Sequence, residues 1–476
     1  MKKKLSIVLV LLLLLTSCGN VQQTDNTKIK EILGKDKLVV ATSADYPPYE
    51  FIKQVDGKNE IVGFDMELAR YIAEKWGVEI EIQDVKFESL LTGLETGMYD
   101  MVIAGMSPSP ERKAEFSDIY YNATQGVLIN KKHLNDIKTV EDLQGKHLGV
   151  QLGSVQEAIL DDMSGIQKKA LANINTLVLE LKTEKIDGII MEKPVAKTYS
   201  DANPDLVLVE DINITDDSGG SAIAMKEGNV ELKNEVNKVI SEVQEKGLLE
   251  KWVVDANNLV NDTSTPTSYS TFFLEGIKQT LLLSLFSLLV GVLLAFLISF
   301  MRMSGNGFIS AIAKIYVEII RGTPLMLQIL IVYYGLDSLG IKLTAFIASL
   351  LAVSLNSSAY VSEIIRSGIE SIDKGQFEAG RSLGLSKNQT MKKIILPQAI
   401  KNILPALGNE FVTLIKETSI ASTIGVGELM FQTTKVQSLS FEAMKPLFIV
   451  SLIYFALTFG ISMLMKQAER KLNYDN

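Results

Sequence analysis

Glu378-Ala379-Gly380-x3-Gly384-x9-Ile394-x-Leu396-Pro397 is the stretch that decides how this chain folds, because apolar segments long enough to cross a bilayer lie on both sides of it. The stretch itself is polar and rich in lysine, and its pattern predicts two short helices. Charged helices are costly against lipid but suit contact with another protein in water. The stretch therefore predicts a docking surface in a membrane protein, with a plain amphipathic hairpin between membrane spans as the alternative.

The composition differs sharply between the two halves of the chain. Its length leaves room for about three domains. The averages of 47% hydrophobic residues and a net charge of −9 combine a polar first half with a second half of long apolar runs. The acidic balance gives no support to nucleic-acid binding, so no nucleic-acid partner is predicted. No metal site and no cofactor held by this chain are predicted either.

Residues 1–20 read MKKKLSIVLVLLLLLTSCGN and have the pattern of an export signal, with a basic head and an apolar core. Cys18, the only cysteine of the sequence, stands where a bacterial lipobox has its lipid-modified residue. The pattern predicts a signal peptide over 1–18 with a lipidated Cys18; a plain signal peptide and an uncleaved first membrane helix are the alternatives. We expect residues 19–36 to be a linker and the segment after it to be exported.

The exported half alternates short β-rich runs with helical patterns. Leu38-Val39-Val40-Ala41 predicts a buried strand, and residues 63–73 carry apolar side chains at helical spacing. Strand-like segments restart at 147–150 and at 188–191. The pattern predicts an α/β domain over 37–256 whose two lobes hold a ligand between them.

Four motifs of this half are specific: Ser43-Ala44-Asp45-Tyr46-Pro47-Pro48-Tyr49-Glu50-Phe51, Gly63-Phe64-Asp65, Ala104-Gly105-Met106-Ser107 running to Arg112 and Phe116-Ser117, and Gln151-Leu152-Gly153-Ser154. They resemble the polar amino acid family of solute-binding proteins. The resemblance implies a two-lobed periplasmic-binding-protein-like fold of type II and a polar amino acid as ligand. It implies a first lobe at about 37–123 and 217–256, a second at about 126–213, and crossovers near 122–125 and 214–220.

A free amino acid is a zwitterion, so its site needs donors or a cation for the carboxylate and an acceptor or anion for the ammonium. The resemblance implies that Arg112 clamps the α-carboxylate, for which its planar fork suits a bidentate contact. It implies that Ser154, at a predicted helix start, completes the carboxylate site from the second lobe. A surface ion pair for Arg112 and a simple N-cap for Ser154 are the alternatives. Gly105 and Ser107 belong to the same expected site.

Glu192 stands where the family usually has an aspartate that binds the α-ammonium, and its side chain is longer by about one methylene group; a salt bridge to Lys193 is the alternative. Tyr46 and Phe51 are candidates for stacking on the ligand side chain or for core packing. The acidic residues near the expected site favour a basic ligand such as arginine or lysine, with glutamine next. These acidic residues are Asp45, Glu50 and Glu192.

The second half is predicted to be an all-α membrane domain over 271–476, joined to the first by a polar linker at 257–270. Five apolar segments each have about the length that a helix needs to cross a bilayer. Their ranges are about 274–300, 324–340, 343–365, 403–424 and 446–465.

Lysine and arginine are concentrated after the third and the fifth apolar segments, whereas the loop after the fourth carries only Lys435 and Lys445. The positive-inside rule therefore predicts that the docking stretch and the C-terminus are cytoplasmic. The same rule leaves the first domain outside. The sequence thus predicts a multi-pass protein of the cell membrane.

Two further motifs accompany the docking stretch, Arg321-Gly322-Thr323-Pro324 and Tyr360-x2-Glu363-x2-Arg366-x-Gly368. All three resemble the amino acid permeases of ATP-binding-cassette (ABC) importers, in which the docking stretch is the EAA loop that receives force from a separate ATPase. The resemblance implies the type 1 importer fold with about five transmembrane helices and an EAA loop at 367–401. Gly380 departs from the usual alanine and weakens its helix by up to about 1 kcal/mol. The residues implied in ATPase coupling are Glu378, Ala379, Gly380, Gly384, Ile394, Leu396 and Pro397.

Two polar positions within the apolar segments are candidates for a translocation path. Asn356 is followed by two serines in an otherwise apolar helix, where small polar residues are also common at helix contacts. Glu363 precedes Arg366 by three residues near a membrane edge, which is compatible with an ion pair and with a role in the path or gate.

The sequence contains no G-x4-G-K-[ST] phosphate-binding motif, so ATP is expected to be used by a partner subunit. One EAA loop per chain predicts a homodimer through the permease domain that binds two ATPase subunits. We therefore expect a transporter subunit and not an enzyme, namely the binding and permease subunit of an importer of polar amino acids. An amino acid-gated channel or receptor is the alternative, although a T-V-G-Y-G filter is absent.

Overall fold

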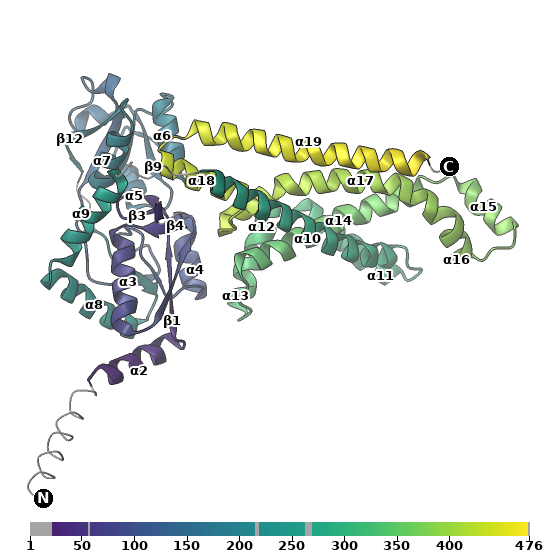
Figure 1. Cartoon of the computed structure of the whole chain (residues 1–476), viewed down its shortest axis with the longest axis horizontal. Coiled ribbons are helices and arrows are strands. Elements are labelled where there is room, and N and C mark those ends of the chain that lie inside the picture. Colours follow the sequence, from purple (N-terminus) through teal and green to yellow (C-terminus); the bar gives the residue numbers. More distant parts are fainter. Residues whose placement is uncertain (1–20, 56–57, 215–218, 262–268, 475–476) are drawn as a thin grey trace, which may run out of the picture. The chain divides into compact units, whose positions relative to one another are not determined.

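The computed structural model describes residues 21–55, 58–214, 219–261 and 269–474 (Figure 1). The chain forms two compact units, Met1–Thr267 and Ser268–Asn476. Cys18 and the predicted signal peptide lie outside the described residues.

The first unit contains two five-stranded sheets, one for each lobe (Figure 1). In the first sheet the order is β5-β1-β6-β13-β7; β1 is parallel to β5 and β6, and β13 is antiparallel to both of its neighbours. The apolar run that predicts a buried strand forms β1, whose Leu38 and Val40 are fully buried. The bounds are β5 (Glu79–Asp84), β1 (Lys37–Thr42), β6 (Met101–Val102), β13 (Ala224–Lys226) and β7 (Ala114–Phe116).

Helices cover this sheet, and a small antiparallel sheet stands beside it. The residues with helical spacing after Gly63 form α3, which buries Phe64, Leu68 and Ile72. The helices are α2 (Val21–Leu33), α3 (Phe64–Trp76), α4 (Leu90–Thr96), α8 (Val230–Glu245) and α9 (Leu248–Asn261), with a 3-10 turn at Phe87–Ser89. The small sheet has strands β2 (Asp45–Tyr46), β3 (Glu50–Val55) and β4 (Lys58–Val62).

The second lobe has the sheet order β10-β9-β11-β8-β12. Its first three strands are parallel, and β8 is antiparallel to β11 and β12. The strands are β10 (Gln167–Leu171), β9 (His147–Gln151), β11 (Gly188–Glu192), β8 (Gln125–Asn130) and β12 (Leu206–Ile214). The helices are α5 (Val155–Asp162), α6 (Ile174–Lys182) and α7 (Lys193–Ala202), with 3-10 turns at Lys131–His133 and Glu141–Leu143.

The chain passes between the two lobes twice, from β7 to β8 and from β12 to β13. Tyr121 and Ser221 form an antiparallel bridge, so the two crossovers lie side by side. Gly220 has a φ of 125°, and a side-chain carbon there would lie 2.4 Å from the backbone oxygen of Tyr121. Glycine is therefore required where the crossovers touch.

Both predicted linkers are in part helical. Most of 19–36 forms α2, which is held to the first lobe by buried Ile29 and by an ion pair of 2.6 Å between Lys28 Nζ and Glu235 Oε1. The predicted linker at 257–270 begins too early, because α9 continues to Asn261 and buries Ala256 on its last turns. Residues 262–268 of that linker lie outside the described residues.

The second unit is all-helical in its described residues, and α10 packs along α14 through small side chains such as Gly291, Ala295 and Ser357. Its helices are α10 (Ser270–Arg302), α11 (Gly307–Gly322), α12 (Leu325–Leu330), α13 (Leu336–Ser338), α14 (Ala345–Glu370), α15 (Lys374–Ser382), α16 (Lys387–Thr390), α17 (Leu396–Glu417), α18 (Leu429–Ser440) and α19 (Met444–Tyr474). Single π-turns lie at Ile331–Gly335 and Met391–Ile395, and a 3-10 turn spans Thr418–Ile424.

In the described part of the chain, the helices long and apolar enough to cross a membrane are Ser270–Arg302, Ala345–Glu370 and Met444–Gln467. A fourth is possible if α11 and the segment Leu325–Ser338, which meet at an angle of 108°, count as one bent span. This count is lower than the five predicted spans. The predicted span at 403–424 lies in α17 and the following 3-10 turn, and this region carries Glu410, Lys416 and Glu417.

Candidate ligand site and coupling hairpin

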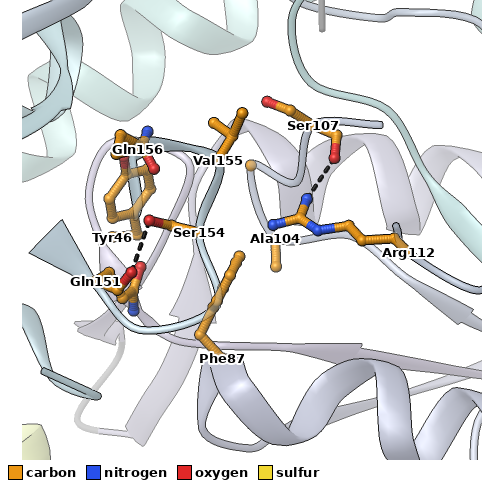
Figure 2. A pocket seen from close by; sticks show the side chains of 10 residues that line it. Tyr46, Phe87, Ala104, Ser107, Arg112, Gln151, Ser154, Val155 and Gln156 are labelled. Atoms are coloured by element: carbon orange, nitrogen blue, oxygen red, sulfur yellow. Dashed lines mark hydrogen bonds between the residues drawn. The ribbon is translucent and has the colours of Figure 1, made fainter. Parts of the chain in front are cut away.

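One pocket lies between the two lobes of the first unit (Figure 2). Tyr46, Gly105, Ser107 and Arg112 line it from the first lobe, and Ser154 lines it from the second. These are five of the seven ligand residues that the sequence predicts. The remaining lining residues are Phe87, Ala104, Gln151, Val155 and Gln156.

Arg112 stands between the lobes. Its Nη1 donates to the backbone oxygen of Ser107, as Figure 2 shows, and its Nη2 donates to the backbone oxygen of Gly153 in the second lobe at 2.7 Å. Its guanidinium carbon lies 5.9 Å from the centre of the Phe87 ring. Burial lowers the pKa of Arg112 to about 10, so the group stays charged at neutral pH. A carboxylate is a stronger acceptor for this fork than the carbonyl oxygens that it contacts here.

Ser154 is the N-cap of α5. Its hydroxyl accepts a hydrogen bond from the backbone N–H of Glu157 at 3.3 Å and donates to the backbone oxygen of Gln151 at 2.6 Å (Figure 2). The N-cap role and the pocket-lining position therefore occur together, since the start of α5 faces the pocket. The first N–H groups of such a helix favour an anion.

Glu192 and Phe51 are not among the residues that line the pocket. Glu192 ends β11 and is buried, and its backbone N–H donates to the hydroxyl of Tyr46 at 3.4 Å. Phe51 is buried on β3, where it pairs with Asp45 of β2 and Val62 of β4. Glu192 thus contacts a lining residue, whereas Phe51 belongs to the small sheet.

Buried carboxyl groups gather next to the pocket in the first lobe. Burial raises the pKa of Asp45 to about 7 and that of Asp65 to about 6. Burial and the neighbouring Asp65 carboxylate raise the pKa of Glu50 well above its usual range. Within the described ranges, none of these three carboxyl groups forms an ion pair with a lysine or arginine. The region favours a positive charge, because an uncompensated buried carboxylate is costly.

Aromatic rings pack against the same region. The rings of Tyr46 and Tyr49 have centres 5.6 Å apart, and Tyr49 contacts Phe64 at 4.4 Å and Tyr121 at 5.6 Å. Burial and the Glu192 carboxylate raise the pKa of Tyr46 and Tyr49 well above the usual value. These phenols therefore stay neutral, and their π-faces are suited to a cation.

The sequence does not identify Phe87, Val155 and Gln156 as lining residues. Gln156 is buried and its Nε2 donates to Oε1 of Gln125, at the start of β8, at 2.8 Å. Of the other lining residues, Gln151 and Ala104 lie in motifs that the sequence shows, Gln151-Leu152-Gly153-Ser154 and Ala104-Gly105-Met106-Ser107. The others depend on how the lobes meet, which no local pattern encodes.

In the second unit, α15 and α16 form the helical hairpin predicted from the docking stretch (Figure 1). Gly384 has a φ of 83°, and the N–H groups of Gly384 and Leu385 donate to the backbone oxygens of Arg381 and Gly380 at 3.0 and 3.2 Å. This is the pattern of a Schellman motif, which ends α15. Ser386 and Gln389 form a capping box that begins α16.

The predicted coupling residues divide into a buried and an exposed set. Gly380 is buried against α16 and the following turn, and a side-chain carbon there would lie 2.7 Å from Cγ2 of Thr390 and 2.9 Å from Cδ1 of Ile394. Ile394 and Leu396 are half-buried. The exposed coupling residues are Glu378, Ala379, Gly384 and Pro397.

The two candidate path residues have partners inside the second unit. Asn356 is buried and its Nδ2 donates to Oε1 of Gln328 at 3.0 Å. The hydroxyl of Ser357, the next residue, donates to Glu410 of α17 at 3.3 Å. Glu363 accepts from Arg302 at the end of α10 and from Nη2 of Arg366 at 2.7 Å. An ion-pair network therefore surrounds Glu363.

Comparison with known proteins divides the chain in the same way. Residues 38–254 match the bacterial extracellular solute-binding proteins, family 3. Residues 287–474 match the binding-protein-dependent transport system inner membrane component.

Individual relatives match each half over nearly their whole length. The arginine-binding extracellular protein ArtP of Bacillus subtilis (strain 168) is 40% identical over 242 residues, 50% of this chain and 90% of ArtP. The arginine transport system permease protein ArtQ of the same strain is 42% identical over 212 residues, 44% of this chain and 97% of ArtQ. The putative glutamine transport system permease protein GlnP of Rickettsia felis (strain ATCC VR-1525 / URRWXCal2) is 40% identical over 202 residues, 42% of this chain and 93% of GlnP.

Proposed function

Because the chain belongs both to the family 3 bacterial extracellular solute-binding proteins and to the inner membrane components of binding-protein-dependent transport systems, we propose that it binds and imports basic amino acids, arginine foremost, with energy from a separate ATPase. The chain joins the binding and permease components of an ABC importer in one polypeptide. It is a transport component and not an enzyme.

The proposal of an amino acid ligand rests on one observation, namely that Arg112 and Ser154 line the same pocket. The Arg112 fork and the first N–H groups of α5 come from opposite lobes, and both favour an anion. An α-carboxylate that replaces the carbonyl oxygens of Ser107 and Gly153 as the acceptor of Arg112 would join the two lobes. Ligand binding and lobe closure are then the same event.

The preference for a basic side chain rests on the carboxyl groups beside the pocket. Glu50 and Asp65 are buried and have no lysine or arginine partner in the described part of the chain. A guanidinium or ammonium group that enters this region is attracted by the carboxylates and by the faces of Tyr46 and Tyr49. Relatives named for arginine match both halves, and one named for glutamine matches the permease half.

Calorimetric titration of the full chain in nanodiscs with arginine, lysine and glutamine tests this proposal. We expect the tightest binding for arginine and no measurable binding after Arg112→Ala. The neighbouring Lys113 is exposed and does not line this pocket, so Lys113→Ala is a matched control that should bind as the wild type does. If glutamine bound more tightly than arginine, glutamine would replace arginine as the proposed substrate. If no amino acid bound, the proposed class of ligand would be wrong.

For the ATPase, we propose that the hairpin of α15 and α16 is its docking surface. Leu383, between the two helices, is 81% exposed, which is unusual for a leucine in a polar loop. The exposed charged residues Arg381, Lys387 and Glu378 belong to the same hairpin. An apolar side chain within a charged rim is the arrangement of a protein contact. One hairpin per chain then requires a homodimer to engage two ATPase subunits.

Co-purification with the cognate ATPase tests the docking surface. Leu383→Glu should abolish recovery of the ATPase and uptake while arginine binding is unchanged, because the pocket lies in the other unit. Leu339→Glu, at another exposed leucine of the same unit, serves as the matched control. If Leu383→Glu still recovered the full amount of ATPase, Leu383 would not be part of the surface that binds the ATPase.

We also propose that the binding unit is extracellular and that the hairpin and the C-terminus are cytoplasmic. The proposal rests on the excess of lysine and arginine in the hairpin and after the last apolar helix. With Cys18 replaced by serine, a cysteine placed at exposed Gln376 should react with an impermeant maleimide only in opened cells. Reaction in intact cells would reverse the orientation.

A further inference from the structure

Asp45 joins the two lobes at a place that is separate from the pocket-lining residues. It lies on β2 in the first lobe and is buried, but it does not line the pocket. Its Oδ2 accepts a hydrogen bond from Nδ2 of Asn173 in the second lobe at 3.2 Å. The backbone N–H of Ile174 also donates to its carboxylate.

These two donors form the start of a helix. Asn173 is the N-cap of α6 and its Oδ1 accepts from the backbone N–H of Thr176 at 3.1 Å. Ile174 is the first residue of α6, so its N–H has no partner within the helix. The carboxylate of Asp45 thus caps a helix of the opposite lobe, where a negative charge is favoured by the helix dipole.

A third contact reinforces the same junction. The hydroxyl of Tyr199, on α7 of the second lobe, lies 3.3 Å from the backbone oxygen of Asp45 and 3.2 Å from Oδ1 of Asn175. Tyr199 is fully buried. On the first-lobe side, the hydroxyl of Ser43 donates to Oδ1 of Asp45 at 3.1 Å, a bond that does not cross between the lobes. The junction is therefore buried and made of directional bonds.

From this geometry we infer that Asp45 is a latch: by capping α6 across the cleft it holds the two lobes closed, and it sets how long a bound amino acid is retained, whatever the side chain of that amino acid. Opening of the lobes breaks the bonds to Asn173, Ile174 and Tyr199 together. The inference rests on the proposed closure of the binding unit around its ligand. It assigns to Asp45 a positioning role that acts through α6 and not through contact with the ligand.

Two variants distinguish an effect on lobe closure from an effect on the folding of either lobe. Asn173→Asp keeps an oxygen that caps α6 but removes the Nδ2 donor and places a second carboxylate next to Asp45. The double variant Asp45→Asn with Asn173→Asp reverses donor and acceptor and restores the bond. Ser43→Ala is the matched control, because it removes a bond to the same carboxylate from within the first lobe.

The test uses the full chain in nanodiscs with Cys18→Ser and fluorescent labels at Glu95→Cys and Gln144→Cys, which are exposed positions in the first and second lobes. Energy transfer between the labels reports the closed fraction without ligand, so the result does not depend on the identity of the transported solute. Stopped-flow release of arginine and of glutamine gives the dissociation rates. We expect Asn173→Asp to lower the closed fraction and to raise both dissociation rates about tenfold, as loss of about 1.4 kcal/mol implies.

The double variant should return both readouts to within about threefold of the wild type, and Ser43→Ala should change them by less than that. An unchanged closed fraction in Asn173→Asp would overturn the latch. A faster release of arginine alone, with an unchanged closed fraction, would show that Asp45 contacts the ligand side chain and would equally overturn it. If the substrate proposal is wrong, the wild type will bind neither arginine nor glutamine, which is a different result from either outcome above.

Discussion

The backbone N–H of Gly105 donates a hydrogen bond of 2.8 Å to the buried carboxylate of Asp65. The hydroxyl of Tyr120 donates to the same carboxylate at 2.8 and 2.9 Å. Gly105 lines the pocket with a φ of 53°, and a side-chain carbon there would lie 3.3 Å from the ring of Tyr49. Asp65 therefore fixes the pocket wall from behind, although it does not line the pocket itself.

Asp65→Ala should destabilise the first unit strongly. The change leaves two buried donors, Gly105 N–H and Tyr120 Oη, without their acceptor, which costs about 2–5 kcal/mol of the free energy of unfolding. Urea denaturation of residues 21–261 measures the loss. Asp36→Ala removes a carboxylate that is 81% exposed and should change stability by less than about 1 kcal/mol. Equal stabilities of the two variants would show that Asp65 does not hold the wall.

The residues of the pocket are predictable to a large part because the family motifs fix both residue type and position. Tyr46, Gly105, Ser107, Arg112 and Ser154 lie far apart in the sequence, yet they line one pocket. The backbone partners of Arg112 and the place of Glu192 behind Tyr46 are not predictable. They depend on how segments far apart in the sequence meet, since Arg112 contacts Gly153 and Glu192 contacts Tyr46, and no local pattern encodes such packing.

The membrane half shows a different limit. A hydropathy window detects the apolar run at 324–340 but misses α11, which precedes this run across a sharp bend. Pro324 separates α11 from α12, since it lacks an N–H group and disfavours helical geometry in Thr323 before it, and the chain turns by 108° there. Amphipathic α11 and charged α17 are placed by tertiary packing, which the window does not detect.

The stability of the binding unit should fall as the pH rises from about 4 to about 7. Burial raises the pKa of Asp45 to about 7 and of Asp65 to about 6, so the folded unit binds more protons than the unfolded chain in this window. Stability falls with pH wherever the folded state binds more protons, by about 1.4 kcal/mol for each unit of pKa shift. Glu242, whose pKa is lowered to about 2 by its lysine partners, acts in the opposite sense and only below about pH 4.

Urea denaturation at pH 5 and pH 7.5 tests this pH dependence. Asp45→Asn cannot titrate and should show a smaller decrease between the two conditions than the wild type. Hydrogen bonds from the backbone N–H groups of Lys138 and Thr139 lower the pKa of half-buried Asp142, so Asp142→Asn should leave the decrease in this range unchanged. A wild type that becomes more stable between pH 5 and pH 7.5 would contradict the raised pKa values.

Gly380→Ala should impair the hairpin, although alanine is the better helix former by about 1 kcal/mol. The added carbon would lie 2.7 Å from Cγ2 of Thr390, and overpacking of this kind costs about 1–3 kcal/mol. Arginine-stimulated ATP hydrolysis in proteoliposomes should therefore fall. Thr390→Ser removes the nearest methyl group and keeps a hydroxyl for the bond to Ser386, so the double variant should recover part of the activity, while the contact with Cδ1 of Ile394 at 2.9 Å remains. Full activity of Gly380→Ala alone would show that the packing is not required.

Glu363→Gln should lower the thermal stability of the membrane unit and not the affinity for arginine. Glu363 and Arg302 are 18% and 14% exposed and connect α14 with α10, and Arg366 donates two hydrogen bonds to the same carboxylate. Loss of the negative charge leaves the guanidinium of Arg302 without compensation, at a cost of about 1–3 kcal/mol. Glu370→Gln is the matched control, because Glu370 pairs with Arg366 and is 62% exposed. Loss of uptake by Glu363→Gln at an unchanged melting temperature would instead make Glu363 part of the translocation path.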